Sequence, residues 1–175
     1  MQNSSSRPDH PAGWTDERLL RACEIRFVRR SGPGGQHRNK TESGVQLIFE
    51  PTGAVAEANE RRSQADNRRV ALARLRRQLA VCVRQGFDAS APLPDVWQRR
   101  VQRGRIVINP QHDDFPVLLA IALDCLAAND WDVRVSADKL RCSATQLVRF
   151  LAEEPAALAE LNRRRVELGL NPLRR

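Results

Sequence analysis

The stretch "EIRFVRRSGPGGQHRNKTESGVQLIFE", residues 24–50, predicts two strands joined by a glycine-rich loop. Its first part alternates, with Ile25 and Phe27 on one face, as in a half-buried strand. After the loop, "GVQLIFE" and then "AVAEA" are further strand candidates, separated by the turn signal "EPTGA". The loop itself holds three glycines and a proline, with arginines before and after it, so it contributes little to a hydrophobic core.

Helical patterns flank these strands. Thr15 can cap a short helix, "TDERLLRAC", which has Asp16 and Glu17 in its first turn. Downstream, "ERRSQADNRRVALARLRRQLAVCV" lacks Gly and Pro and predicts a long helix with apolar residues at helical spacing: Leu72, Leu75, Leu79 and Val83. Arginines spaced by seven are expected to form a strip along one flank of this apolar stripe: Arg62, Arg69 and Arg76. Residues 15–84 therefore predict a small α+β unit.

The rest of the chain predicts a linker and then an all-α unit. Residues 85–110 contain three prolines and Trp97 and are interpreted as the linker. Residues 111–175 begin with an apolar helix that has Pro116 near its start, and they end with a helix stopped by Gly169 and Pro172. With residues 1–14 as a flexible lead, the predicted domains are 1–14, 15–84, 85–110 and 111–175.

Between those two helices, "SADKLRCSATQLVRFLAEE" resembles a helix-turn-helix, with Ser143 and Gln146 at capping-box spacing. One interpretation is a second RNA contact through Arg141 and Arg149. The favoured interpretation is a small helical bundle with a leucine core: Leu140, Leu147, Leu151 and Leu158.

The charge is concentrated in one region. The chain carries a net charge of +8, and residues 21–85 hold fourteen basic and six acidic side chains, whereas residues 111–175 hold nine and ten. A local excess of arginine is typical of proteins that bind polyanions, and here RNA is the favoured partner. The alternative is that this basic excess is ordinary solvated surface charge with no binding role.

Composition also excludes several classes of site. The four cysteines make no CxxC or Cys/His cluster, so neither a metal site nor a disulfide framework is expected, and no cofactor is indicated. The longest apolar run is too short to cross a bilayer, and the N-terminal residues have no apolar export signal. We therefore expect a cytoplasmic protein with no membrane contact, whose oligomeric state the sequence does not indicate.

The Gly-Gly-Gln tip of the loop suits one kind of chemistry. Glycines let backbone N–H groups approach a substrate closely, and a glutamine amide can orient water but has no useful pKa for proton abstraction. Such a tip favours water attack on an activated ester, helped by positioning and by stabilisation of developing charge. His37 adjoins the tip and is interpreted as a polar loop residue.

Taken with its neighbours, the loop resembles a known family. "SGPGGQHRNKTES", then "PTG" and "RRSQADNRRVALARL", are similar to the catalytic domain of class I peptide chain release factors, in the same order and at suitable spacing. The resemblance covers residues 15–84. Arg38 and Gly44 depart from the residues common at their positions.

The resemblance implies a function and a partner. In the family this domain enters the peptidyl-transferase centre of the large ribosomal subunit, where the loop helps water to hydrolyse the ester of peptidyl-tRNA. It implies catalytic roles for Gly34, Gly35 and Gln36, and it marks Gln36 as the target of a dedicated glutamine methyltransferase. The residues expected to contact rRNA are Arg29, Arg30, Arg38, Lys40, Arg61, Arg62, Arg68 and Arg69.

Two functions follow from this reading. Only fourteen residues precede the first helix, and no Pro-x-Thr or Ser-Pro-Phe codon-reading tripeptide occurs, so the chain is more similar to the short, codon-independent members that rescue stalled ribosomes. In those with a well-understood mechanism a basic tail enters the mRNA channel, whereas this chain ends in a nearly neutral helical unit. The alternative is a non-catalytic ribosome-binding or RNA-binding protein that docks through the domain and recruits a partner through the helical unit.

Overall fold

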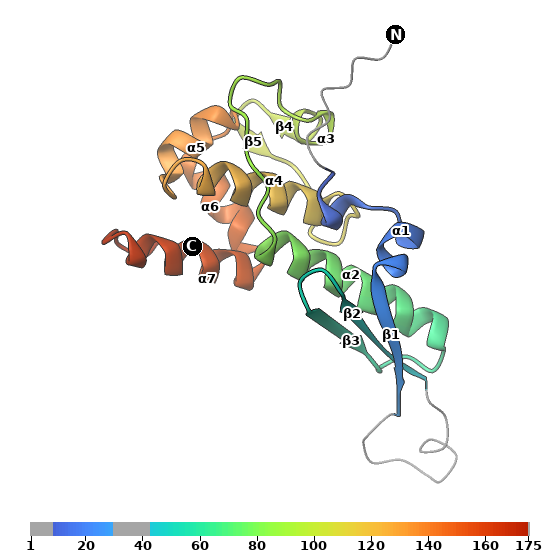
Figure 1. Cartoon of the computed structure of the whole chain (residues 1–175). Coiled ribbons are helices and arrows are strands. Elements are labelled where there is room, and N and C mark those ends of the chain that lie inside the picture. The colour runs from blue at the N-terminus through green and yellow to red at the C-terminus, as the bar shows by residue number, and fades with distance from the viewer. Residues whose placement is uncertain (1–8, 30–42, 175) are drawn as a thin grey trace. The chain divides into compact units, whose positions relative to one another are not determined.

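The computed structural model describes residues 9–29 and 43–174 (Figure 1). The fold is α+β, as the sequence predicted, with short antiparallel sheets and several helices. The chain divides into two compact units, one formed by Pro11–Leu79 and one by Met1–His10 with Ala80–Arg175. Each unit has its own buried side chains and is described separately.

The first unit contains a three-stranded sheet and the helices that accompany it. In chain order its elements are η1 (Pro11–Gly13), α1 (Asp16–Arg21), β1 (Cys23–Val28), β2 (Gly44–Phe49), β3 (Ala54–Ala58) and α2 (Gln64–Cys82), which continues past Leu79 into the second unit. Thr15 caps α1 as predicted, since its Oγ1 accepts the N–H of Arg18 at 3.3 Å.

The sheet is antiparallel, in the order β1-β2-β3. Across β2 and β3, large residues pair with alanines on the buried face: Val45 with Ala58, Leu47 with Ala56, and Phe49 with Ala54. The alanines leave room for further side chains, and Leu72, Leu75 and Leu79 of α2 are also buried. Figure 1 shows α2 running alongside the sheet.

Two details of the long helix differ from the sequence prediction. The helix begins at Gln64, so Arg62 precedes it and lies on no helical strip. Arg76 is on the helix, but its side chain is only 15% exposed and bonds within the unit, to Asp16 at 2.6 Å and to the carbonyl oxygen of Ala12 at 3.1 Å. The predicted strip of three arginines is therefore wrong, because tertiary contacts occupy one member and the helix start excludes another.

A buried asparagine connects three backbone groups of the first unit. Asn67 on α2 is fully buried, and its Nδ2 donates to the carbonyl oxygens of Ser43 at 2.6 Å and Arg61 at 3.0 Å. Its Oδ1 accepts the N–H of Arg61 at 2.9 Å. One side chain therefore attaches the residue before β2 and the segment before α2 to the helix.

The second unit is mainly helical. Its elements are α3 (Asp95–Gln98), β4 (Val101–Gln102), β5 (Arg105–Ile106), α4 (Phe115–Ala127), α5 (Val133–Lys139), α6 (Ala144–Ala152) and α7 (Pro155–Glu167). Residues 85–110, interpreted as a linker from sequence, include α3 and the β4–β5 hairpin. Trp97 is fully buried there, with its Nε1 donating to the carbonyl oxygen of Leu140 at 2.9 Å.

The turn between α5 and α6 has the predicted arrangement of two short helices. Ser143 caps α6, since its Oγ accepts the N–H of Gln146 at 3.2 Å, and Arg141 adopts a left-handed conformation at φ 57° in the turn. Leu140, Leu147 and Leu151 are fully buried, whereas Leu158 is partly exposed. These burials support the helical-bundle interpretation of this segment.

A partly buried histidine also belongs to the second unit. The Nε2–H of His10 donates to the carbonyl oxygen of Val83 at 3.3 Å. Burial lowers the pKa of His10 to about 4, and this effect outweighs the hydrogen bond to Val83, which acts in the opposite direction. The folded chain therefore holds His10 neutral across the range in which an exposed histidine becomes protonated.

We expect Asn67→Ala to destabilise the first unit. The substitution leaves the buried carbonyl oxygen of Ser43 and the partly buried one of Arg61 without their donor, which costs about 2–4 kcal/mol in the free energy of unfolding. Urea unfolding of the full chain measures the loss. The matched control is Gln64→Ala at the exposed first position of α2, and an equal loss in both variants would contradict the role of Asn67.

We also expect the stability to depend on pH through His10. Between pH 6.5 and about 4 the unfolded chain binds a proton that the folded chain does not bind. The free energy of unfolding therefore decreases as the pH is lowered through this range, by up to about 3 kcal/mol. His10→Gln should flatten this part of the profile, measured by urea unfolding at several pH values. An unaltered slope in His10→Gln would disprove the assignment.

Candidate functional site

The strands β1 and β2 frame the predicted catalytic loop. Their pairing runs from Cys23 opposite Phe49 to Val28 opposite Gly44, so residues 29–43 connect two adjacent, hydrogen-bonded strand ends. Six residues predicted for the site lie outside the described residues: Arg30, Gly34, Gly35, Gln36, Arg38 and Lys40. Their roles therefore stay predictions, and the structure defines the frame that holds the loop's two ends.

Gly44 allows a close approach at the base of this frame. A Cβ atom at this position would lie 2.7 Å from the carbonyl oxygen of Val28 and 2.6 Å from its Cγ2. Real Cβ atoms do not approach backbone oxygens so closely, so alanine would require the paired strands to shift. The departure from the family pattern at Gly44 thus has a local reason in the spacing of β1 and β2.

Asn67 joins the C-terminal end of the loop to the basic segment. Through its amide, the carbonyl of Ser43 and both backbone groups of Arg61 share one buried side chain. Sequence reasoning missed this residue. The available signal was an asparagine, a poor helix former, inside an otherwise favourable helix and next to the arginines of the matched motif.

The described basic residues differ in how exposed their side chains are. Arg29, Arg61 and Arg62 are exposed. The side chain of Arg69 is 80% exposed and pairs with Asp66 at 3.1 Å, an exposed ion pair that contributes little to stability and can be exchanged for another anion. Arg68 is half-buried, and its Nε is buried without a hydrogen-bond partner in the structure.

Two other arginines of α2 are occupied within the protein. Arg74 donates to the carbonyl oxygen of Glu57 at 2.6 Å and pairs with Glu60 at 2.6 Å, and Arg76 bonds to Asp16 and Ala12. Because both guanidinium groups already have anionic or carbonyl partners, a polyanion would have to displace them. Arg61, Arg62 and Arg69, which precede α2 or lie in its first turns, are by contrast exposed.

The described residues offer little other catalytic chemistry. Burial raises the pKa of Cys142 to about 12 and that of Cys23 to about 11, so neither thiol ionises appreciably at neutral pH or becomes an activated nucleophile. In the part of the chain that the structure describes, no cluster of three His, Cys, Asp or Glu side chains could hold a metal ion. Within the same residues, no helix combines the length and apolar character needed to span a bilayer.

Comparison with known proteins identifies the domain that holds this frame. The family model for the RF-1 domain matches residues 20–101. An uncharacterized mitochondrial peptide chain release factor-like protein of Saccharomyces cerevisiae is 55% identical over 87 residues, which cover 47% of this chain and 54% of the yeast protein. Peptide chain release factor 1 of Xylella fastidiosa is 53% identical over 56 residues, covering 32% of this chain and 16% of that protein.

A third relative shows the same partial coverage. Peptide chain release factor 1 of Leptothrix cholodnii is 47% identical over 72 residues, 40% of this chain and 20% of that factor. The chain thus spans about half the length of the yeast relative and a fifth or less of these two release factors. No solved structure matches the chain significantly. The matched residues contain the three-stranded sheet, the loop and α2, and this part of the chain is similar to the RF-1 domain of peptide chain release factors.

Proposed function

We propose that the protein hydrolyses the ester of peptidyl-tRNA on stalled ribosomes, without reading a stop codon. The observation that carries the proposal is the Gly-Gly-Gln tripeptide at residues 34–36, placed by sequence between two paired strands of a release-factor domain. The relatives that share this domain are named as release factors or as release factor-like.

The chemistry assigned to the loop is positioning of water. Water attacks the carbonyl carbon that links the peptide to the tRNA ribose, the carbon–oxygen bond to the ribose breaks, and the ribose oxygen leaves with a proton. In this proposal the backbone N–H and side-chain amide of Gln36 stabilise the developing charge and orient the water. Gly34 and Gly35 allow the backbone to approach the ester.

The proposed partner is the rRNA of the large ribosomal subunit. Arg61, Arg62 and Arg69 are exposed, and Asn67 links the backbone of Arg61 to that of Ser43 at the end of the loop. We infer that they contact phosphates, together with Arg29, Arg68 and the basic residues of the loop itself. The ion pair of Arg69 with Asp66 is exposed enough to exchange for such a contact.

Codon independence is the finer part of the proposal. It is supported by the sequence, which contains no Pro-x-Thr or Ser-Pro-Phe codon-reading tripeptide. It is also supported by the similarity to a release factor-like protein over about half of that protein's length. Modification of Gln36 by a glutamine methyltransferase is proposed as well, and intact-mass analysis of the native protein tests it.

We expect Gln36→Ala to reduce peptide release by a factor on the order of 10²–10³, because it removes one amide from the reacting centre. The assay measures release of labelled peptide from ribosomes stalled on truncated mRNA. His37→Ala is the matched control in the same loop and should release peptide at nearly the wild-type rate. Full release by Gln36→Ala, or release only in the presence of a stop codon, would contradict the proposal.

Reversal of Arg62 and Arg69 to Glu should weaken ribosome binding and flatten its dependence on salt, since each lost phosphate contact lowers the slope by about one. Sedimentation with ribosomes at several salt concentrations measures this. Reversal of Arg21 and Arg99, two exposed arginines outside the proposed contact, matches the change in net charge. Equal effects of the two double variants would show that only the total charge matters.

A further inference from the structure

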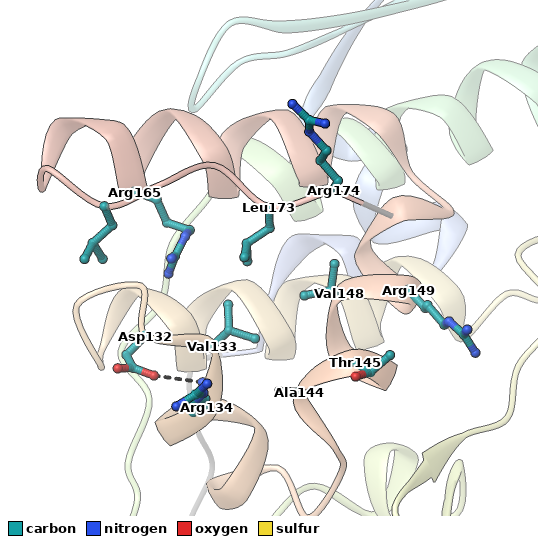
Figure 2. A pocket seen from close by; sticks show the side chains of 11 residues that line it. Asp132, Val133, Arg134, Ala144, Thr145, Val148, Arg149, Arg165, Leu173 and Arg174 are labelled. Carbon is teal, nitrogen blue, oxygen red and sulfur yellow. Dashed lines mark hydrogen bonds between the residues drawn. The ribbon is translucent and has the colours of Figure 1, made fainter.

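A groove in the second unit lies between α5, α6, α7 and the residues that follow α7. It has a volume of about 600 Å³, and its apolar lining consists of aliphatic side chains: Val133, Ala144, Val148, Leu170 and Leu173. Figure 2 shows Leu173 and Arg165 on one side of this groove, with Val133 and Val148 on the other. We name it the α5–α7 groove.

One wall of the α5–α7 groove is held in place by side-chain contacts to the backbone. Asn162 on α7 donates to the carbonyl oxygen of Leu173 at 3.0 Å and accepts its N–H at 2.7 Å. Arg165 donates to the carbonyl oxygens of Asn171 at 3.0 Å and Trp131 at 3.1 Å. The segment after α7 is therefore folded back along the helix, and these contacts hold Leu173 in the lining of the groove, facing Val133 and Val148 (Figure 2).

The rim of the groove carries an excess of positive charge. Four arginines line it, against one acidic residue: Arg134, Arg149, Arg165 and Arg174 against Asp132. The carboxylate of Asp132 is occupied as the cap of α5, where it accepts the N–H groups of Arg134 at 2.8 Å and Val135 at 3.0 Å. The single negative charge of Asp132 therefore offsets the positive charge of the four rim arginines only in part.

Three of the rim arginines lack the ion pairs that several other arginines of the unit form. Arg84, Arg100 and Arg163 form ion pairs with Asp124, Asp114 and Glu160 at 2.9, 2.8 and 2.7 Å. Within the described residues, the guanidinium groups of Arg134, Arg149 and Arg174 have no carboxylate at ion-pair distance. A nearly neutral unit thus leaves three cations unneutralised around one apolar depression.

The surroundings of the groove are also apolar and exposed. Among the described residues, seven large hydrophobic side chains are exposed, and four of these belong to α5, α7 or the segment after it: Val135, Val166, Leu168 and Leu170. Exposed aliphatic surface beside an unneutralised rim is typical of a site for another chain.

From this arrangement we propose that the α5–α7 groove binds an acidic protein segment that carries aliphatic side chains. Carboxylates of the segment pair with Arg134, Arg149 and Arg174, and its leucine-like side chains bury against Val148 and Leu173. Residues 1–8 and 30–42 of this chain contain one acidic residue between them, Glu42, so they do not supply such a segment. The occupant is a partner protein.

The lining favours a protein over RNA. Sites that bind single-stranded RNA stack its bases on aromatic side chains, and no aromatic residue lines this groove. Aliphatic floors instead suit the side chains of an amphipathic peptide. The inference is independent of the proposed hydrolytic activity, because it concerns residues outside the release-factor domain.

The test uses the full chain and a synthetic twelve-residue peptide built of Glu-Glu-Leu-Leu repeats. We expect binding with a Kd on the order of 10–100 μM, measured by fluorescence anisotropy. Shifts of backbone amides in the NMR spectrum should be confined to residues 132–174. The double variant R134E/R149E should weaken binding about tenfold or more, and Leu173→Ala should weaken it with the charges unchanged.

Controls separate this inference from its alternatives. The exposed hairpin arginines Arg103 and Arg105, reversed to Glu, match the charge change and should leave binding intact. The same peptide with glutamine for each glutamate should bind much more weakly. The proposal is overturned if no binding is detected at 1 mM peptide or if R134E/R149E binds the peptide as wild type does. It is also overturned if a twelve-nucleotide uridylate shifts the same amide signals and binds with a lower Kd than the peptide.

Discussion

The first unit depends on the satisfied amide of Asn67. A fully buried amide is costly to leave unpaired, and here each of its polar atoms meets a backbone partner that itself needs one. Those partners belong to Ser43 and Arg61. Separating the end of the loop from the start of the basic segment would therefore leave buried polar groups unpaired, and this cost holds the two segments together. The chain is therefore fixed before the proposed catalytic loop by strand pairing, and after it by strand pairing together with this amide.

The arginines of the first unit consequently fall into two groups. Arg74 and Arg76 donate to carbonyl oxygens and carboxylates of the protein itself, so their charge stabilises the fold. Arg61, Arg62 and Arg69 are exposed and keep their charge available. Net charge alone counts these groups together. The structure separates them, since only a guanidinium without a strong internal partner can bind an external phosphate without first losing a contact.

Local signals in the sequence predicted the helices and strands well, but they could not predict contacts between residues far apart in the sequence. The cap at Thr15, the cap at Ser143 and the turn before β3 each depend on neighbouring residues and were confirmed. The roles of Asn67, Arg76 and Trp97 depend on partners 24, 60 and 43 residues away, so no periodicity indicated them. For the site, sequence motifs supplied the tripeptide and the family, while the frame around Gly44 required coordinates.

The second unit shows the same limit for charge. Its nine basic and ten acidic residues between 111 and 175 suggest a neutral surface, yet Glu160 and Glu167 are used by Arg163 and Arg164 along one side of α7. These two carboxylates therefore neutralise arginines of α7 itself, and the arginines around the α5–α7 groove have no carboxylate partner among the described residues. Because electrostatic attraction over a few ångströms depends on local and not on total charge, a neutral unit can still present a basic surface to a partner.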